Sequence, residues 1–224
     1  MKQSVVWLSR VIFSLSIMVL LPGEIYASQP AATPVQLIQQ AQAGDKVAQY
    51  QLASFYRQQP RTRESARQAF NWMLAAAEQG HAAAQAEVAD FYRTGYGVEV
   101  DLVQSAGWYQ KSSMQGYAPG HFGLGRMYYR GQGVAQDFKR AYELYQLAAK
   151  DGHASAQAAL GYMSDNGLGV KQNDIEALKW YLLSAEKWYT ANSYVYYMRQ
   201  KMDDASVNEA RTLAGQFKAE NYPE

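Results

Sequence analysis

The sequence predicts an all-α protein, an α/α solenoid wound as a right-handed superhelix from tandem helix-turn-helix repeats of 36 residues. Three observations predict this fold. Glycines recur every 36 residues, at Gly44, Gly80, Gly116 and Gly152, and the segments that follow them align without gaps. Within each segment, small and apolar residues recur at offsets of four and seven, the period of a buried helix face. A turn with two glycines divides each of the later segments into two helical halves.

The first residues are typical of a secretory signal. Lys2 and Arg10 bracket a short positive region, and residues 11–21 form an apolar run too short to span a membrane comfortably. We expect cleavage after Ala27, which makes residues 1–27 a signal peptide and the mature chain an exported protein, periplasmic or secreted. An uncleaved signal anchor is the alternative.

Charge and composition exclude several function classes. Without residues 1–27 the chain carries 19 basic and 19 acidic side chains, so its formal charge is zero. A neutral chain of mixed signs gives no support to nucleic-acid binding or to an electrostatic role at a membrane. There is no cysteine, which excludes disulfides, thiolate metal sites and a cysteine nucleophile.

The expected organisation runs from one capping region to another. Residues 28–43 are predicted as a short arm, 28–33, followed by a lone capping helix. Residues 188–224 are predicted as a degenerate capping helix pair, because terminal repeats of a solenoid usually deviate. Between them lie four tandem repeats, at residues 44–79, 80–115, 116–151 and 152–187.

The first helix of each repeat carries columns of small and large residues. One small column holds Ala53, Ala89, Gly125 and Gly161. We expect its two glycines to let a neighbouring helix approach closely, so that Gly161→Leu costs roughly 1–3 kcal/mol by overpacking. The Trp and Tyr residues that recur in the second helix are predicted to be core, because periodic apolar stripes face inward.

The connection between the two helices has its own pattern. It reads GYGV at 95–98, GQGV at 131–134 and GLGV at 167–170. The first glycine can end a helix at positive φ, and the second helps the chain to reverse. Acidic or amide side chains that follow each turn are expected to cap the next helix. The first repeat reads RQQPRTRES instead, with Ser65 as the expected cap.

These motifs resemble the Sel1-like repeat (SLR) family, a relative of the tetratricopeptide repeats. The shared pattern is A-x-x-x-LG-x-x-Y, then G-x-GV-x-x-D, then A-x-x-WY-x-x-AA, and it covers roughly residues 35–220. The resemblance implies a binding scaffold for another protein or peptide, and exported bacterial members act as adaptors in the cell envelope. It also implies two alternatives: a structural subunit of an envelope machine, such as a flagellar motor or secretion complex, and an enzyme acting on cell-wall or β-lactam-like ligands.

The resemblance also places a binding groove. In the tetratricopeptide arrangement, a concave groove is lined by first-helix positions that lie between the core columns. Aromatic residues and arginines, which are enriched in binding hot spots, stand at many of these positions. Together with one aspartate they form the predicted site: Tyr50, Arg57, Asp90, Arg93, Phe122, Arg126, Tyr129, Arg130, Tyr162 and Tyr194. Truncating Phe122 and Arg126 together is expected to abolish partner binding and to leave the fold intact.

No residues point to catalysis or to a metal. His81 and His153 occupy one column of the repeat, so they follow the repeat rather than a site. Metal sites need clustered ligands, and two residues that lie two repeats apart cannot share an ion. No GxSxG, P-loop or HExxH motif is present, and the glycine turns join two helices instead of a strand and a helix. We therefore expect no catalytic residues, no metal and no cofactor.

Overall fold

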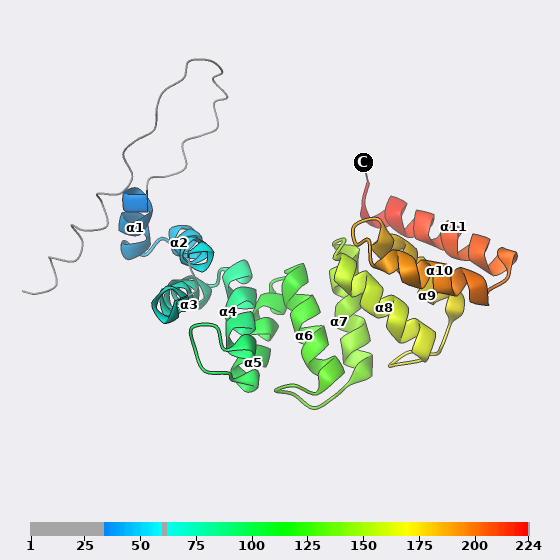
Figure 1. Ribbon diagram of the computed structural model, residues 1–224, viewed down its shortest axis with the longest axis horizontal. Coiled ribbons are helices and arrows are strands. Elements are labelled where there is room, and N and C mark those ends of the chain that lie inside the picture. Colours follow the sequence, from blue (N-terminus) through cyan, green and yellow to red (C-terminus); the bar gives the residue numbers. More distant parts are fainter. Residues whose placement is uncertain (1–33, 60–61, 224) are drawn as a thin grey trace, which may run out of the picture. The chain divides into compact units, whose positions relative to one another are not determined.

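The computed structural model describes residues 34–59 and 62–223, and this part of the chain is helical with no strand. The predicted signal peptide 1–27 and arm 28–33 lie outside the described residues. The helices are α1 Pro34–Gln42, α2 Lys46–Gln58, α3 Arg63–Glu78, α4 Ala82–Thr94, α5 Leu102–Met114, α6 Ala118–Arg130, α7 Phe138–Lys150, α8 Ala154–Asn166, α9 Asp174–Ala185, α10 Ala191–Lys201 and α11 Asp204–Asn221 (Figure 1).

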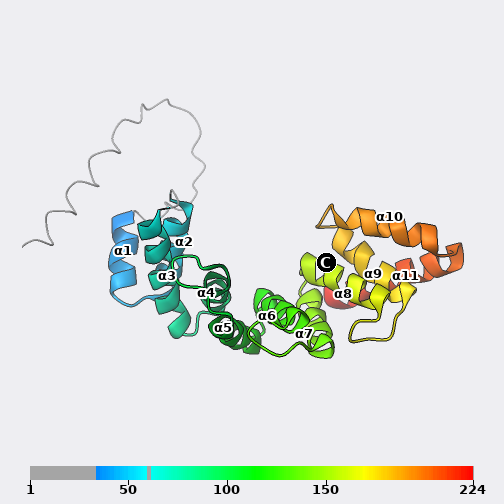
Figure 2. The same cartoon turned by 60° about the horizontal axis from the view of Figure 1, so that its bottom comes forward.

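Helices that are adjacent in sequence pack as pairs, and each pair packs on the next. The pairs are α2 with α3, α4 with α5, α6 with α7 and α8 with α9. The first helix α1 packs on α2, while α10 and α11 each pack on α9, and Figure 2 shows the pairs following one another. The all-helical solenoid is thereby confirmed.

The glycine turns end the first helices as predicted. Gly95, Gly131 and Gly167 adopt left-handed φ values of 75°, 64° and 66° at the ends of α4, α6 and α8. Asp101, Asp137 and Asn173 then cap α5, α7 and α9 by accepting backbone N–H bonds. The first repeat differs from the expectation, because Thr62 is the N-cap of α3 and Ser65 completes a capping box with it.

The second glycine of each turn is a contact between repeats, which the sequence did not reveal. A Cβ atom at Gly133 would lie 1.9 Å from the carbonyl oxygen of Leu102, at the start of α5 in the preceding repeat. A Cβ atom at Gly97 would lie 2.2 Å from the carbonyl oxygen of Ala66, and one at Gly169 would lie 2.3 Å from that of Phe138. The turn therefore packs its bare backbone against the first turn of the preceding second helix.

A glutamine ladder also joins successive repeats. Gln49 and Gln85 donate from Nε2 to the carbonyl oxygens of Ala41 and Ala77, both at 3.1 Å. Gln157 donates to Ala149 in the same way at 3.5 Å. These side chains are buried, and each bond adds a side-chain donor to a carbonyl that already accepts from the backbone N–H of the repeat glycine, Gly44, Gly80 or Gly152.

Two histidines cap first helices. Nδ1 of His81 accepts from the backbone N–H of Ala84 at 3.2 Å, and Nδ1 of His153 accepts from that of Ala156 at 3.3 Å. Burial lowers the pKa of both side chains. Protonation would remove the acceptor and place a positive charge at the positive end of the helix dipole.

These caps predict a dependence of stability on pH. A lowered native pKa means that the unfolded chain binds protons more readily, so the free energy of unfolding falls as pH drops below about 6.5. His153→Asn keeps a cap acceptor that does not titrate, and we expect it to lose less stability than the parent between about pH 7.5 and about pH 5.5. Urea unfolding at both pH values measures this, and equal losses in variant and parent would contradict it.

Candidate binding face

Two neighbouring hollows lie along the first helices of successive repeats. The larger, here called the aromatic hollow, has a volume of about 510 Å³ and lies over α6, α8 and α10, with residues of α7 and α9 beneath. The smaller, the arginine hollow, has a volume of about 370 Å³ and lies over α2, α4 and α6. Arg126 of α6 lines both, so together they form a continuous first-helix face.

The aromatic hollow is built from stacked rings. Phe122 lies 4.5 Å from the ring of His153 and 5.6 Å from that of Tyr145, measured between ring centroids. At the other end Tyr194 stacks on Tyr181 at 5.0 Å with an interplanar angle of 9°. Because Tyr145 and Tyr181 are buried second-helix residues, the repeat core itself forms the floor of the hollow.

Exposed aromatic side chains rim this hollow. Tyr162, Tyr194 and Trp188 are 45%, 43% and 40% exposed, so part of each ring is open to a partner. Tyr129 is half-buried beside Tyr162, and burial raises the pKa of Tyr129, so its hydroxyl stays protonated at neutral pH. The rim thus combines apolar ring area with hydroxyl donors.

Two arginines of the arginine hollow bind the same aspartate. Arg93 donates to Oδ1 of Asp90 from Nε at 2.9 Å and from Nη2 at 2.6 Å. Arg126 reaches the same oxygen from the next repeat at 3.3 Å and also donates to the hydroxyl of Tyr109 at 3.1 Å. In the same hollow Arg57 pairs with Glu87, whose pKa burial raises against the opposing effect of that arginine.

A comparison of the sequence with models of known protein families identifies the family of this chain. The Sel1 repeat model matches four consecutive segments, at residues 46–81, 82–117, 118–153 and 154–187. The chain belongs to the Sel1 repeat family. Sel1 repeat proteins are generally protein-interaction scaffolds and typically non-catalytic.

Two solved Sel1 structures share the fold. One is a protective antigen present in uropathogenic Escherichia coli strains, with a TM-score of 0.77, 26% identity and 84% of this chain covered. This chain spans only 41% of that antigen's length. The other is a Sel1 repeat protein from Oxalobacter formigenes, with a TM-score of 0.64, 27% identity, 86% of this chain and 78% of the other covered. No curated protein matches the chain.

The structure brings nine of the ten predicted site residues into the two hollows. The aromatic hollow holds Phe122, Arg126, Tyr129, Arg130, Tyr162 and Tyr194. The arginine hollow holds Arg57, Asp90, Arg93 and again Arg126. Tyr50 lines neither and stacks instead on the capping His81, with 4.6 Å between ring centroids. Which of them contact a partner stays a prediction.

The double variant Phe122→Ala with Arg126→Ala removes two side chains that make contacts within this Sel1 fold. Phe122 packs on the ring of Tyr145, and Arg126 bonds to the buried Tyr109. Arg126 is only 23% exposed, and the centroid of the Phe122 ring lies 5.7 Å from its guanidinium carbon. The expectation that this variant leaves the fold intact stays a prediction, and Tyr162, which is 45% exposed, is the simpler position for a test.

Sequence reasoning missed Trp188. It stands where the repeat pattern has a glycine, and it lines the aromatic hollow from the turn between α9 and α10. An aromatic residue that replaces a repeat glycine was the available signal. The structure also shows that the buried core tyrosines Tyr145 and Tyr181 line the floor of the hollow.

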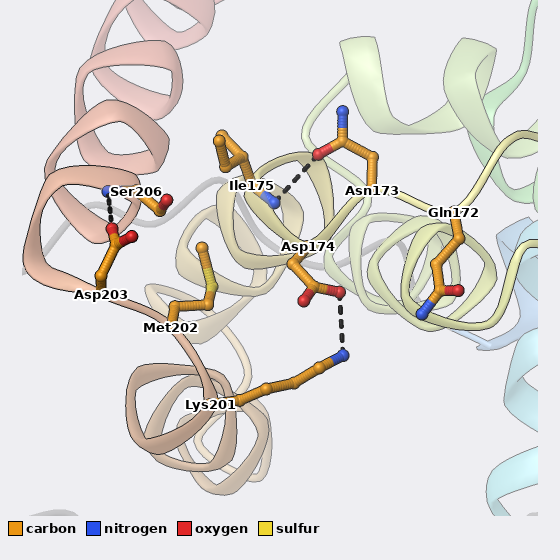
Figure 3. A pocket seen from close by; sticks show the side chains of 8 residues that line it. All are labelled: Gln172, Asn173, Asp174, Ile175, Lys201, Met202, Asp203 and Ser206. Carbon is orange, nitrogen blue, oxygen red and sulfur yellow. Dashed lines mark hydrogen bonds and ion pairs between the residues drawn. The ribbon is translucent and has the colours of Figure 1, made fainter.

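A third hollow, of about 490 Å³, lies between the start of α9 and the junction of α10 and α11 (Figure 3). Several of its polar side chains already have structural partners. Asn173 caps α9, Asp203 caps α11, and Lys201 pairs with Asp174 at 2.8 Å (Figure 3). This hollow is therefore a junction between capping helices and a weaker binding candidate than the first-helix face.

Within residues 34–59 and 62–223, no three His, Asp or Glu side chains gather in a way that could hold a metal ion. No helix of the same described part is long and apolar enough to span a membrane.

Proposed function

We propose that this Sel1 repeat protein is a non-catalytic adaptor of the bacterial cell envelope, exported to the periplasm or secreted, that binds a protein or peptide through its first-helix face. The two hollows carry the proposal, because they line up aromatic and arginine side chains from successive repeats on helices that are already fixed. A preorganised surface loses little conformational entropy when it binds. Tyr, Trp and Arg are the residues that dominate binding energies at protein interfaces.

Export rests on the signal pattern of residues 1–27. We take as further support that a Sel1 protein with a similar structure is a protective antigen present in uropathogenic Escherichia coli strains. No catalytic residues, metal or cofactor enter the proposal.

Site-specific crosslinking in intact cells tests the face. A photoreactive phenylalanine derivative is introduced at Tyr162, on the rim of the aromatic hollow, and at Tyr196, a 68% exposed tyrosine of α10 that does not line it. We expect a covalent partner adduct from position 162 and little from position 196. The reverse result would favour the alternative of a structural envelope subunit that makes contact through its repeat ends.

The partner identified in this way allows a quantitative prediction. Tyr162→Ala should weaken its binding by about 2 kcal/mol, roughly thirtyfold in Kd, because a rim aromatic that packs against a partner behaves as a hot spot. Tyr196→Ala is the matched control and should change Kd less than twofold. Isothermal titration calorimetry measures both, and equal losses would move the contact away from the hollow.

A further inference from the structure

We infer that the first-helix face takes an extended acidic peptide, whose carboxylates meet Arg126 and Arg130 while its apolar side chains enter the aromatic hollow. The inference rests on the proposed function and specifies the chemistry of the partner. It follows from three features of the face: its local charge, the contacts of its arginines, and the shape of its aromatic hollow.

The face is locally cationic although the expected mature chain is neutral. Its two hollows are lined by Arg57, Arg93, Arg126 and Arg130, against only Glu87 and Asp90, which leaves a formal charge of +2. The aromatic hollow is lined by no acidic side chain. A partner of opposite charge is therefore favoured, and a basic partner is disfavoured by like-charge repulsion.

Arg126 can engage a ligand carboxylate without leaving Asp90 unpaired. Asp90 already receives two short bonds from Arg93, whereas Arg126 reaches it by a single bond of 3.3 Å. If a ligand carboxylate engages Arg126, Asp90 keeps Arg93 and is not left as an unpaired charge. Nε of Arg126 is buried and has no hydrogen-bond partner among the described residues.

Arg130 is the free cation of the face. Its side chain is exposed, and no described acidic residue forms an ion pair with it. It stands four residues after Arg126 on α6, which brings the two side chains onto one side of the helix, about 5–6 Å apart at Cβ. Alternate side chains of an extended chain lie about 6.7 Å apart on one side, so acidic residues at positions i and i+2 match this spacing.

The aromatic hollow favours an extended chain over a helix. A helix carries side chains all around its backbone and is about 10–12 Å across. An extended chain is thinner and can lower alternate side chains into the hollow of about 510 Å³, which Tyr162, Tyr194 and Trp188 rim. Its apolar side chains then meet the exposed rings of this rim.

Selection from a random peptide library tests the inference with defined probes. A phage-displayed dodecapeptide library is selected at low salt on the immobilised mature chain and, in parallel, on Arg130→Gln. This variant removes an exposed charge that pairs with no described acidic residue, and its circular dichroism melt should match the parent. We expect the parent to enrich peptides with acidic residues at alternate positions among apolar ones, and the variant to enrich them poorly.

The leading peptide is then synthesised with its acidic residues intact and, separately, with each Glu or Asp replaced by its amide. The acidic form should bind the parent about tenfold more tightly than the amide form, and Arg130→Gln should remove most of that difference. Equal affinity of the two forms, or enrichment of basic peptides or of none, overturns the inference. The proposed function is judged apart from this, because crosslinking at position 162 requires no acidic partner.

Discussion

Replacement of Gly133 by alanine is expected to lower the free energy of unfolding by roughly 2–4 kcal/mol. Two effects add at this position. The backbone has φ of 70°, a left-handed conformation that costs a side-chain-bearing residue about 1–2 kcal/mol. The new Cβ would lie 1.9 Å from the carbonyl oxygen of Leu102, so the third repeat must shift away from the second.

Gly116→Ala is the matched control for this prediction. Gly116 has φ of 75°, but no atom would lie within 4 Å of its Cβ, so only the cost of the left-handed backbone remains. Urea unfolding followed by circular dichroism measures both variants. Because Gly133 lies at an interface between repeats, its variant should also unfold with a shallower denaturant dependence, since cooperativity in a solenoid depends on such interfaces. Equal losses at positions 116 and 133 would contradict the contact with Leu102.

The helices of the fold could be predicted because the same sequence pattern recurs in several repeats. A column such as Gly131 and Gly167 shows the same helix stop in two repeats, and Asp137 and Asn173 show the same cap. The contact made by Gly133 could not be predicted in the same way. Its neighbour, Leu102, belongs to another repeat, and the sequence period does not say which surfaces of adjacent repeats touch.

The position of the candidate site could be predicted, but its electrostatics could not. The register of the first helix placed Arg93 and Arg126 on one face. That Arg126 joins Arg93 at Asp90 depends on side-chain reach across a repeat boundary. The same holds for Arg130, which pairs with no acidic residue in the described part of the chain. Trp188 was missed because it belongs to the degenerate end of the array, where the repeat pattern no longer assigns columns.

Replacement of Gly161 by leucine is the second large effect expected, at about 3 kcal/mol, the upper end of the range for overpacking. Even a Cβ atom at this position would lie 2.7 Å from the ring of Tyr181, and leucine adds three further carbon atoms. Tyr181 is 1% exposed and cannot swing into solvent without opening the core between α8 and α9. Equilibrium unfolding in urea measures the loss, and a variant that unfolds like the parent would contradict the close contact.

A double-mutant cycle with Tyr181→Ala separates this contact from a general loss of packing. If the leucine and the tyrosine ring compete for one space, the double variant should be more stable than the sum of the two single losses predicts, by about 1–2 kcal/mol.

Tyr181 also belongs to the binding face, because it stacks on Tyr194 at 5.0 Å and forms part of the floor of the aromatic hollow. Gly161→Leu alone should therefore weaken binding of the acidic peptide as well, since a displaced Tyr181 ring moves Tyr194 with it. Additive losses in stability would show that the leucine side chain of Gly161→Leu and the ring of Tyr181 do not compete for the same space. A Gly161→Leu variant that remains folded and binds the peptide like the parent would show that the core of the fourth repeat does not position the hollow.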